Sequence, residues 1–225
     1  MKQLRAVIFD LDNTLISSRV DFRRMRTEII DLLLRLRVPP NRLSENMLIS
    51  EIVKVAVNNL RERGFTEEEI KNILTKIAEI MNRVELESLN ENLNPMENAV
   101  KTLKRLKELN LKVGVITNSC REYAERALAK LGLRSYIDSV VARDYVEEMK
   151  PNPKNALHLL NLLGVNNEEA VFIGDHWLDA ECARRAGIRF ILIERGENPR
   201  MISEYNCRKI GDLWEIIDLI ESGKL

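Results

Sequence analysis

Short apolar runs alternate with amphipathic segments over most of the chain, and this pattern predicts a sheet covered by helices. The first run, 6–9, has no polar interruption, which is typical of a strand buried on both faces of a parallel sheet. Further apolar runs of strand length lie at 111–116, 139–142, 170–173 and 189–193, with helical spacing between them. Strands that alternate with helices favour right-handed crossovers. We therefore expect an α/β fold with a doubly wound parallel sheet.

The segment 16–93 interrupts this alternation, because its apolar residues recur at helical spacing with no strand pattern between them. Three amphipathic stripes lie at 22–36, 47–60 and 70–84. The sequence thus predicts an all-helical insertion at 16–93 within a core domain formed by residues 1–15 and 94–225.

Capping residues predict where several helices begin and end. Thr66 and Glu69 form a capping box at the start of the third stripe. Asn94 and Pro95 favour the start of a helix that runs to about residue 109. Ser119 has a glutamate three residues later, so we assign it to a helix cap.

Charge and cysteine content exclude several classes of protein. The 225 residues contain 35 Lys and Arg and 35 Asp and Glu, so the formal net charge is zero. No overall field attracts nucleic acid or an anionic membrane, and no apolar run reaches the roughly 20 residues that cross a bilayer. Cys120, Cys182 and Cys207 are widely spaced, which is typical of reduced thiols. We expect a cytoplasmic protein without nucleic-acid or membrane partners, and no pattern sets an oligomeric state.

Polar side chains follow four of the expected strands at their carboxyl ends. They are Asp10 and Asp12, then Thr117 and Asn118, then Lys150, then Asp175 and Asp179. Because the carboxyl ends of parallel strands share one edge of a sheet, these residues should meet in one crevice. Clustered carboxylates would repel an anionic substrate unless a cation were present. Mg²⁺ prefers such oxygen ligands, so the set suits a phosphate and a magnesium ion.

Phosphoryl transfer to a carboxylate assigns a task to each of these groups. Asp10 would attack phosphorus, and Asp12 would donate a proton to the leaving alcohol and later remove one from water. Thr117 and the backbone N–H groups after it would hold phosphate oxygens at a helix N-terminus. Lys150 would supply positive charge. The substrate would be a small phosphorylated metabolite.

The same residues resemble the four motifs of the haloacid dehalogenase superfamily. In order, the matching segments are Asp10-x-Asp12-Asn13-Thr14-Leu15, Thr117-Asn118, Lys150-Pro151 and Gly174-Asp175-x-x-x-Asp179. The resemblance implies a Rossmann-like core with a helical cap inserted between the first two motifs, and a phosphatase similar to phosphoglycolate phosphatases.

The resemblance also implies a role for each matching residue. Asp10, Asp12 and Lys150 would be catalytic, and Thr117, Asn118 and Lys150 would bind phosphate. The Mg²⁺ ligands would be Asp10, the backbone carbonyl of Asp12, Asp175 and Asp179, the last directly or through water.

Other functions fit part of the pattern. A true dehalogenase of the superfamily lacks the acid two residues after the nucleophile, so Asp12 disfavours that activity. Phosphomutases of the superfamily share all four motifs and stay open. A non-catalytic protein that senses or binds a phosphometabolite is a third reading, but it would not need a general acid. An arginine cluster at 19–26 would be either a solvated helix face or a contact for an anionic substrate tail.

Overall fold

The computed structural model describes residues 3–145, 149–194 and 205–225, and the chain separates into two compact units. One unit comprises Met1–Ser18 and Asn92–Leu225, and the other comprises Arg19–Glu91. The domain limits expected from the sequence, 15/16 and 93/94, differ from these by a few residues. The roles of core and cap stay a prediction.

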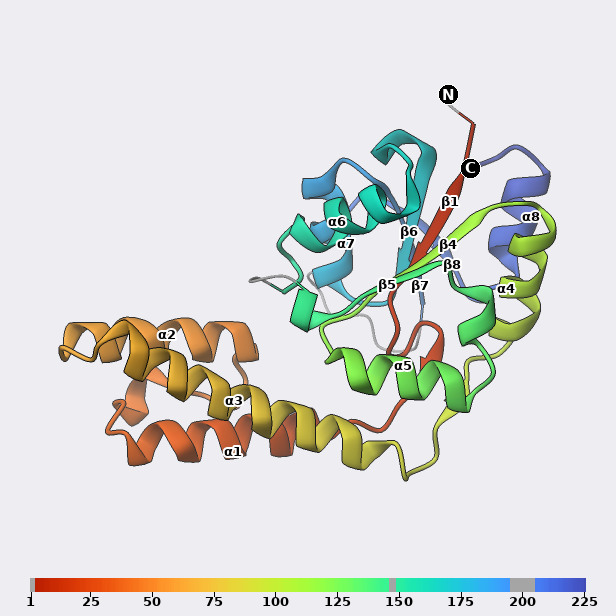
Figure 1. Ribbon diagram of the computed structural model, residues 1–225. Helices are drawn as coiled ribbons and strands as arrows, with labels where there is room; N and C mark the ends of the chain where they lie inside the picture. Colours follow the sequence, from red (N-terminus) through yellow and green to blue (C-terminus); the bar gives the residue numbers. More distant parts are fainter. Residues whose placement is uncertain (1–2, 146–148, 195–204) are drawn as a thin grey trace. The chain divides into compact units, whose positions relative to one another are not determined.

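The larger unit is built on a six-stranded sheet in which all neighbours are parallel, in the order β5-β4-β1-β6-β7-β8 (Figure 1). Its strands are β1 (Ala6–Phe9), β4 (Lys112–Ile116), β5 (Ser139–Val141), β6 (Ala170–Gly174), β7 (Arg189–Ile193) and β8 (Arg208–Ile210). The expected α/β fold with a parallel sheet is confirmed. The apolar runs predict the first five strands but not β8, because two of its three residues are exposed cations and no apolar run marks it.

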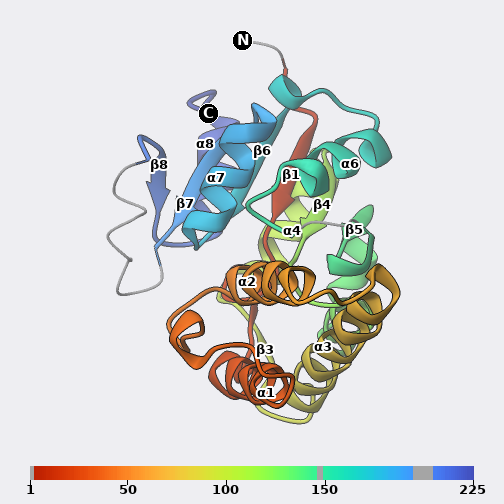
Figure 2. The same cartoon turned by 90° about the vertical axis from the view of Figure 1, so that its left-hand side faces the viewer.

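Helices cover both faces of this sheet. α6 (Lys154–Leu163) and α7 (Trp177–Ala186) lie on one face, and α4 (Ala99–Glu108) and α8 (Glu215–Glu221) lie on the other (Figures 1 and 2). Alternate residues of β1 point to opposite faces, so Ala6 and Ile8 join the core beneath α6 and α7. Burial of each large apolar side chain contributes about 1.5–3 kcal/mol.

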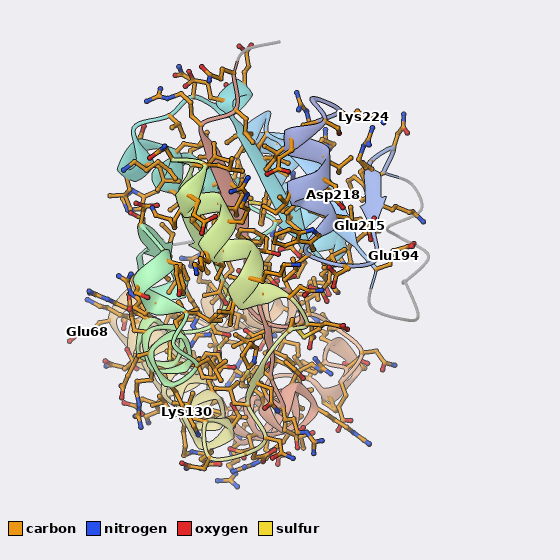
Figure 3. The ribbon with its side chains drawn as sticks, turned by 90° about the vertical axis from the view of Figure 1, so that its right-hand side faces the viewer. Glu68, Lys130, Glu194, Glu215, Asp218 and Lys224 are labelled. Carbon is orange, nitrogen blue, oxygen red and sulfur yellow. The ribbon has the colours of Figure 1, made fainter. Side chains whose placement is uncertain are left out.

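The view onto the second face shows α4 and α8 in front of the strands, with Glu215 and Asp218 on α8 (Figure 3). Glu194, at the end of β7, pairs with Lys209 of β8 at 3.0 Å. The remaining helices of this unit are α5 (Arg121–Lys130) and the short 3₁₀ turns η2 (Arg134–Tyr136), η3 (Arg143–Tyr145) and η4 (Asn167–Glu169).

The smaller unit consists of α1 (Phe22–Arg35), η1 (Pro40–Arg42), α2 (Ile49–Glu62) and α3 (Glu67–Ser88). The Thr66 capping box is confirmed: its hydroxyl accepts from the N–H of Glu69, and the Glu69 carboxylate accepts from the N–H of Thr66. Most of the expected stripes are buried, but Phe22 and Leu74 are 39% and 37% exposed. At these two positions the apolar pattern does not mark a buried side chain.

The arginine cluster at the start of the helical unit forms ion pairs. Arg23 pairs with Glu45 at 3.4 Å, and Arg24 pairs with Glu28 at 2.9 Å and Glu87 at 2.7 Å. These contacts favour the solvated-face reading of Arg23 and Arg24.

The two connections between the units lie side by side within the larger unit. β2 (Ile16–Ser17) pairs antiparallel with β3 (Asn94–Pro95). The expected helix start at Asn94 is therefore wrong, and α4 begins at Ala99 after Asn98. Pairing with β2 holds Pro95 in an extended conformation that a proline accepts as readily as the first turn of a helix.

The described residues also bear on the membrane and cysteine expectations. Among the helices of 3–145, 149–194 and 205–225, none has both the length and the apolar composition that a membrane crossing requires. The three cysteines form no disulfide, and Cys120 and Cys182 are buried.

Candidate active site

The carboxyl ends of β1, β4 and β6 place three of the sequence-predicted residues at one edge of the sheet. Asp10 follows β1, Thr117 follows β4 and Asp175 follows β6. The hydrogen-bond ladder continues one residue beyond the strands: the Asp10 N–H donates to the Ile173 carbonyl at 2.9 Å, and the Thr117 N–H to that of Val141 at 3.0 Å. The backbone at Asp10 and Thr117 is therefore held by the hydrogen bonds of the sheet.

Lys150 lies at the centre of the site, although it follows β5 by nine residues of chain. Its Nζ donates to Oδ1 of Asp10 at 2.5 Å and to Oδ1 of Asp179 at 2.6 Å. It also donates to the Ile116 carbonyl at 3.3 Å. Lys150, Asp10 and Asp179 are 4%, 7% and 1% exposed, so this ion-paired group is shielded from water.

Asn118 fixes the backbone of Lys150. Its Oδ1 accepts from the Lys150 N–H at 2.8 Å, and its Nδ2 donates to the Lys150 carbonyl at 3.2 Å. The side-chain amide is thus engaged with Lys150. The expected contact of Asn118 with phosphate stays a prediction, and it would have to come from the backbone N–H.

Asp175 and Asp179 bring two further carboxylates to the cluster. One oxygen from each of Asp10, Asp175 and Asp179 lies within 4.8 Å of the other two. The Thr14 hydroxyl donates to Asp175 Oδ1 at 3.3 Å. Oδ2 of Asp179 accepts from the His176 N–H at 3.1 Å, which places Asp179 in the first turn of α7.

Gly174 leaves the space that Asp179 occupies. A Cβ at position 174 would lie 2.5 Å from Asp179 Oδ2 and 2.6 Å from its Cβ. Such distances are far inside van der Waals contact, so only glycine allows this approach of α7 to the end of β6.

The electrostatic balance of the site is unfavourable to its carboxylates. Burial, together with repulsion from Asp179, Asp175 and Asp12, raises the pKa of Asp10 well above its usual value against the attraction of Lys150. Burial and repulsion from Asp179 also raise the pKa of Asp175, to about 6. Burial opposes the charge of Lys150, but attraction to Asp10 and Asp179 outweighs it and raises the pKa of the ammonium group.

These carboxylates suit a divalent cation. They outnumber the Lys150 ammonium group that they surround, and a hard cation with oxygen ligands would offset the remaining negative charge. The donor set therefore fits the expected Mg²⁺ at Asp10, Asp175 and Asp179.

Asp12 lies beside this cluster, at the start of a tight turn. The N–H of Asn13, whose φ is 60°, donates to the Ile16 carbonyl at 2.7 Å. Asp12 Oδ2 accepts from the Ser119 hydroxyl at 3.0 Å, and Oδ1 accepts from the Tyr123 hydroxyl at 2.8 Å. The expected helix-capping role of Ser119 is wrong: the N-cap of α5 is Cys120, and the Ser119 hydroxyl is directed to Asp12.

The structure brings Asp10, Lys150, Asp175 and Asp179 into one cluster, with Thr117 and Asp12 on adjoining turns. The Thr117 hydroxyl accepts from the Ser119 N–H at 3.0 Å. Sequence reasoning gave no role to Thr14 or Tyr123, which contact Asp175 and Asp12. Thr14 lies within the first motif, so the motif could have marked it as a site residue. Tyr123 lies in a helix and in none of the motifs, so nothing in the sequence marked it.

His176 also takes a structural position here. Its Nδ1 accepts from the Leu178 N–H at 3.3 Å, so the ring caps α7. Burial lowers the pKa of this imidazole, which favours the neutral ring that such a cap requires.

Comparisons with known proteins bear on the family of this chain. A sequence model described as haloacid dehalogenase-like hydrolase matches residues 7–193. Pyrophosphatase PpaX of Halalkalibacterium halodurans is 33% identical over 128 residues, which are 55% of this chain and 60% of that protein. Phosphoglycolate phosphatase of Aquifex aeolicus is 28% identical over 218 residues, covering 96% of this chain and 97% of that protein.

A crystal structure described as a predicted phosphoglycolate phosphatase from Haemophilus somnus has the same fold. Its TM-score is 0.67 at 22% identity, and the match covers 97% of this chain and 99% of that one. The expected resemblance and the expected enzyme class, a phosphatase, are thereby confirmed. With its motif residues gathered at the end of the sheet, the chain belongs to the haloacid dehalogenase-like hydrolase family.

Proposed function

We propose that the protein is a Mg²⁺-dependent phosphatase that hydrolyses a small phosphorylated metabolite through an aspartyl-phosphate on Asp10. The observation that carries the proposal is the position of Asp10, which is buried, bound to Lys150 at 2.5 Å and grouped with Asp175 and Asp179. A buried carboxylate in this setting has a cationic neighbour on one side and a candidate cation site on the other. Both would draw a phosphoryl group toward its oxygens.

The first step forms a bond between an Asp10 oxygen and phosphorus and breaks the bond from phosphorus to the ester oxygen. The leaving alcohol oxygen takes a proton from Asp12. Thr117 and the N–H groups before α5 would hold phosphate oxygens. Lys150 would balance the charge of Asp10 and of the transferred group.

The second step hydrolyses the aspartyl-phosphate. Asp12 removes a proton from water, the water oxygen bonds to phosphorus, and the bond between phosphorus and Asp10 breaks. Inorganic phosphate leaves, and both carboxylates return to their starting states. Mg²⁺ held by Asp10, Asp175, Asp179 and the Asp12 carbonyl would offset the negative charge that carboxylates and phosphate bring together.

The substrate would be a small phosphate monoester, because named relatives include a phosphoglycolate phosphatase that matches nearly the whole chain. The helical unit is assigned to substrate selection, a role that rests on the family resemblance. A phosphate-release screen over sugar phosphates, phosphoglycolate, nucleotides and amino-acid phosphates would identify the class. We expect release that requires Mg²⁺ and is abolished by excess chelator.

The covalent step has its own test. Acid quenching of the enzyme with ³²P-labelled acetyl phosphate should leave label on the wild type that hydroxylamine removes. The Asp10→Asn variant should carry none. Unchanged phosphate release by Asp10→Asn, or in excess chelator, would contradict the mechanism.

Two alternatives are distinguished by following isomer formation and binding on the same panel of compounds. A phosphomutase would convert a sugar phosphate to its isomer without releasing phosphate. A phosphometabolite-binding protein would bind a compound of the panel tightly without turnover.

A further inference from the structure

Asp12 is held differently from the carboxylates around Lys150. Both of its oxygens accept hydrogen bonds from hydroxyl groups, Oδ2 from Ser119 at 3.0 Å and Oδ1 from Tyr123 at 2.8 Å. Two bonds to the two oxygens of one carboxylate fix its rotation about the side-chain axis as well as its position. This geometry restricts the direction in which Asp12 can pass or receive a proton.

The two hydroxyl groups come from rigid surroundings. Tyr123 is 0% exposed and lies in the first turn of α5, and Ser119 is 3% exposed. The Ser119 N–H donates to the Thr117 hydroxyl at 3.0 Å, and its carbonyl accepts from the Arg143 N–H at 3.1 Å. The position of the Ser119 hydroxyl is therefore set by the segment that follows β4.

Hydroxyl partners suit a group that changes its protonation state. A hydroxyl donates to an ionised carboxylate and, after rotation of its O–H bond, accepts from a protonated one. A lysine or arginine partner could only donate and would oppose protonation. Ser119 and Tyr123 can therefore hold Asp12 in both states that proton transfer requires.

We propose that Ser119 and Tyr123 are positioning residues that orient the Asp12 carboxylate for proton transfer to the leaving group and from water. The inference rests on the proposed function, because it assigns Asp12 to proton transfer. Misplacement of a reacting group by about 1 Å can cost on the order of 100-fold in rate.

The test compares two esters that differ in their need for a proton. Phenyl phosphate has a poor leaving group, whereas 2,4-dinitrophenyl phosphate has one that leaves as an anion. kcat/KM reports steps up to phosphoryl transfer, so it isolates the acid role of Asp12. In Tyr123→Phe and Ser119→Ala we expect kcat/KM for phenyl phosphate to fall on the order of 10- to 100-fold. For the dinitrophenyl ester it should fall by less than about threefold.

Three further variants complete the experiment. Tyr205→Phe is the matched control, because it removes a tyrosine hydroxyl that donates to another carboxylate, that of Glu181, at 3.0 Å. It should leave the ratio of the two kcat/KM values unchanged. Ser119→Thr keeps the hydroxyl, so its ratio of the two kcat/KM values should be closer to the wild-type ratio than that of Ser119→Ala. Asp12→Asn should change this ratio the most.

The outcomes separate the inference from the proposed function. The inference would be overturned if kcat/KM in Tyr123→Phe fell equally for both esters, or did not fall, while Asp12→Asn still showed a dependence on the leaving group. If Asp12→Asn itself showed none, or the wild type hydrolysed neither ester, the proposed function would fail and this inference with it. Thermal unfolding of each variant shows whether a loss reflects folding.

Discussion

The carboxylates at the end of the sheet and the carboxylates of the helical unit occupy opposite electrostatic settings. Around Lys150 they lie close to one another; Asp10 and Asp179 are buried, and the pKa values of Asp10 and Asp175 are raised. In the helical unit, Glu28 and Glu87 are 30% and 48% exposed in their side chains and interleave with Arg24 and Arg83. Hydrogen bonds from these arginines lower the pKa of both glutamates against the opposing effect of burial.

This difference separates a site from a surface. Opposite charges that alternate on helix faces satisfy each other, so nothing further needs to bind. Like charges gathered in a buried site are costly unless a ligand offsets them. The chain thus concentrates unfavourable electrostatics at the end of the sheet, where we place substrate and cation.

The largest expected effect follows from removing the nucleophile. Asp10→Asn should lower phosphate release by roughly a thousandfold or more, because it removes the group that we propose forms the covalent intermediate. Glu181→Gln is the control, since Glu181 is also a buried carboxylate but is paired with Arg184 and Arg185. It should retain activity within a few-fold. Comparable loss in both variants would mean that the cluster around Asp10 has no special role.

The second prediction concerns pH and the metal-free protein. The pKa of Asp175 is about 6 in the folded state and about 4 when unfolded. The folded state therefore holds this proton more tightly, and the contribution of Asp175 to stability falls as pH rises from about 4 to 6. The full effect is at most about 3 kcal/mol.

Denaturant unfolding in chelator, compared between wild type and Asp175→Asn, measures this contribution. As pH rises, the free energy of unfolding of the variant should increase relative to that of the wild type. In saturating Mg²⁺ the wild type should be the more stable protein. Glu181 should behave oppositely, because its hydrogen bond from Arg184 above all lowers its pKa to about 2. Its stabilisation should be lost as pH falls from about 4.5 to 2. If the wild type instead became more stable relative to Asp175→Asn as pH rises, the proposed repulsion among the site carboxylates would be contradicted.

A third prediction uses two glycines that both face a close neighbour. Gly174→Ala would push Asp179 away from Lys150 and raise the Mg²⁺ concentration needed for half activity on the order of 10- to 100-fold. Gly114→Ala would press on Leu159, with Cδ2 2.7 Å from the new Cβ. It should cost about 1–3 kcal/mol of stability with the Mg²⁺ requirement unchanged. Metal titrations of activity and denaturant unfolding of both variants check this contrast.

The smallest effect is expected in the helical unit. Glu28→Gln removes the partner of Arg24 and Arg83, but exposed ion pairs contribute little. We expect Tm to fall by less than about 3 °C and the difference to shrink in high salt. A larger fall in Tm that high salt does not reduce would show that these ion pairs contribute to stability as buried ion pairs do. Calorimetry at two ionic strengths gives the answer.

Much of the fold could be predicted because its signals are local. Short, largely apolar stretches marked β1, β4, β5, β6 and β7, and helical periodicity marked α1, α2 and α3. The strand β8 carried no such signal because two of its three residues are exposed cations, and β2 and β3 carried none because each has only two residues. Asn94 and Pro95 fit a helix start locally, and only the contact with Ile16 and Ser17 decided otherwise.

For the active site, the sequence by itself determined which residue types follow which strands, and hence that Asp10, Thr117, Lys150 and Asp175 should meet. That inference works because parallel strands end at one edge. Only the tertiary structure decided how these groups pair: Lys150 between Asp10 and Asp179, Asn118 on the Lys150 backbone, and Ser119 with Tyr123 on Asp12. Hydrogen bonds need positions correct to a few tenths of an ångström, and packing between elements 29 to 140 residues apart sets those positions.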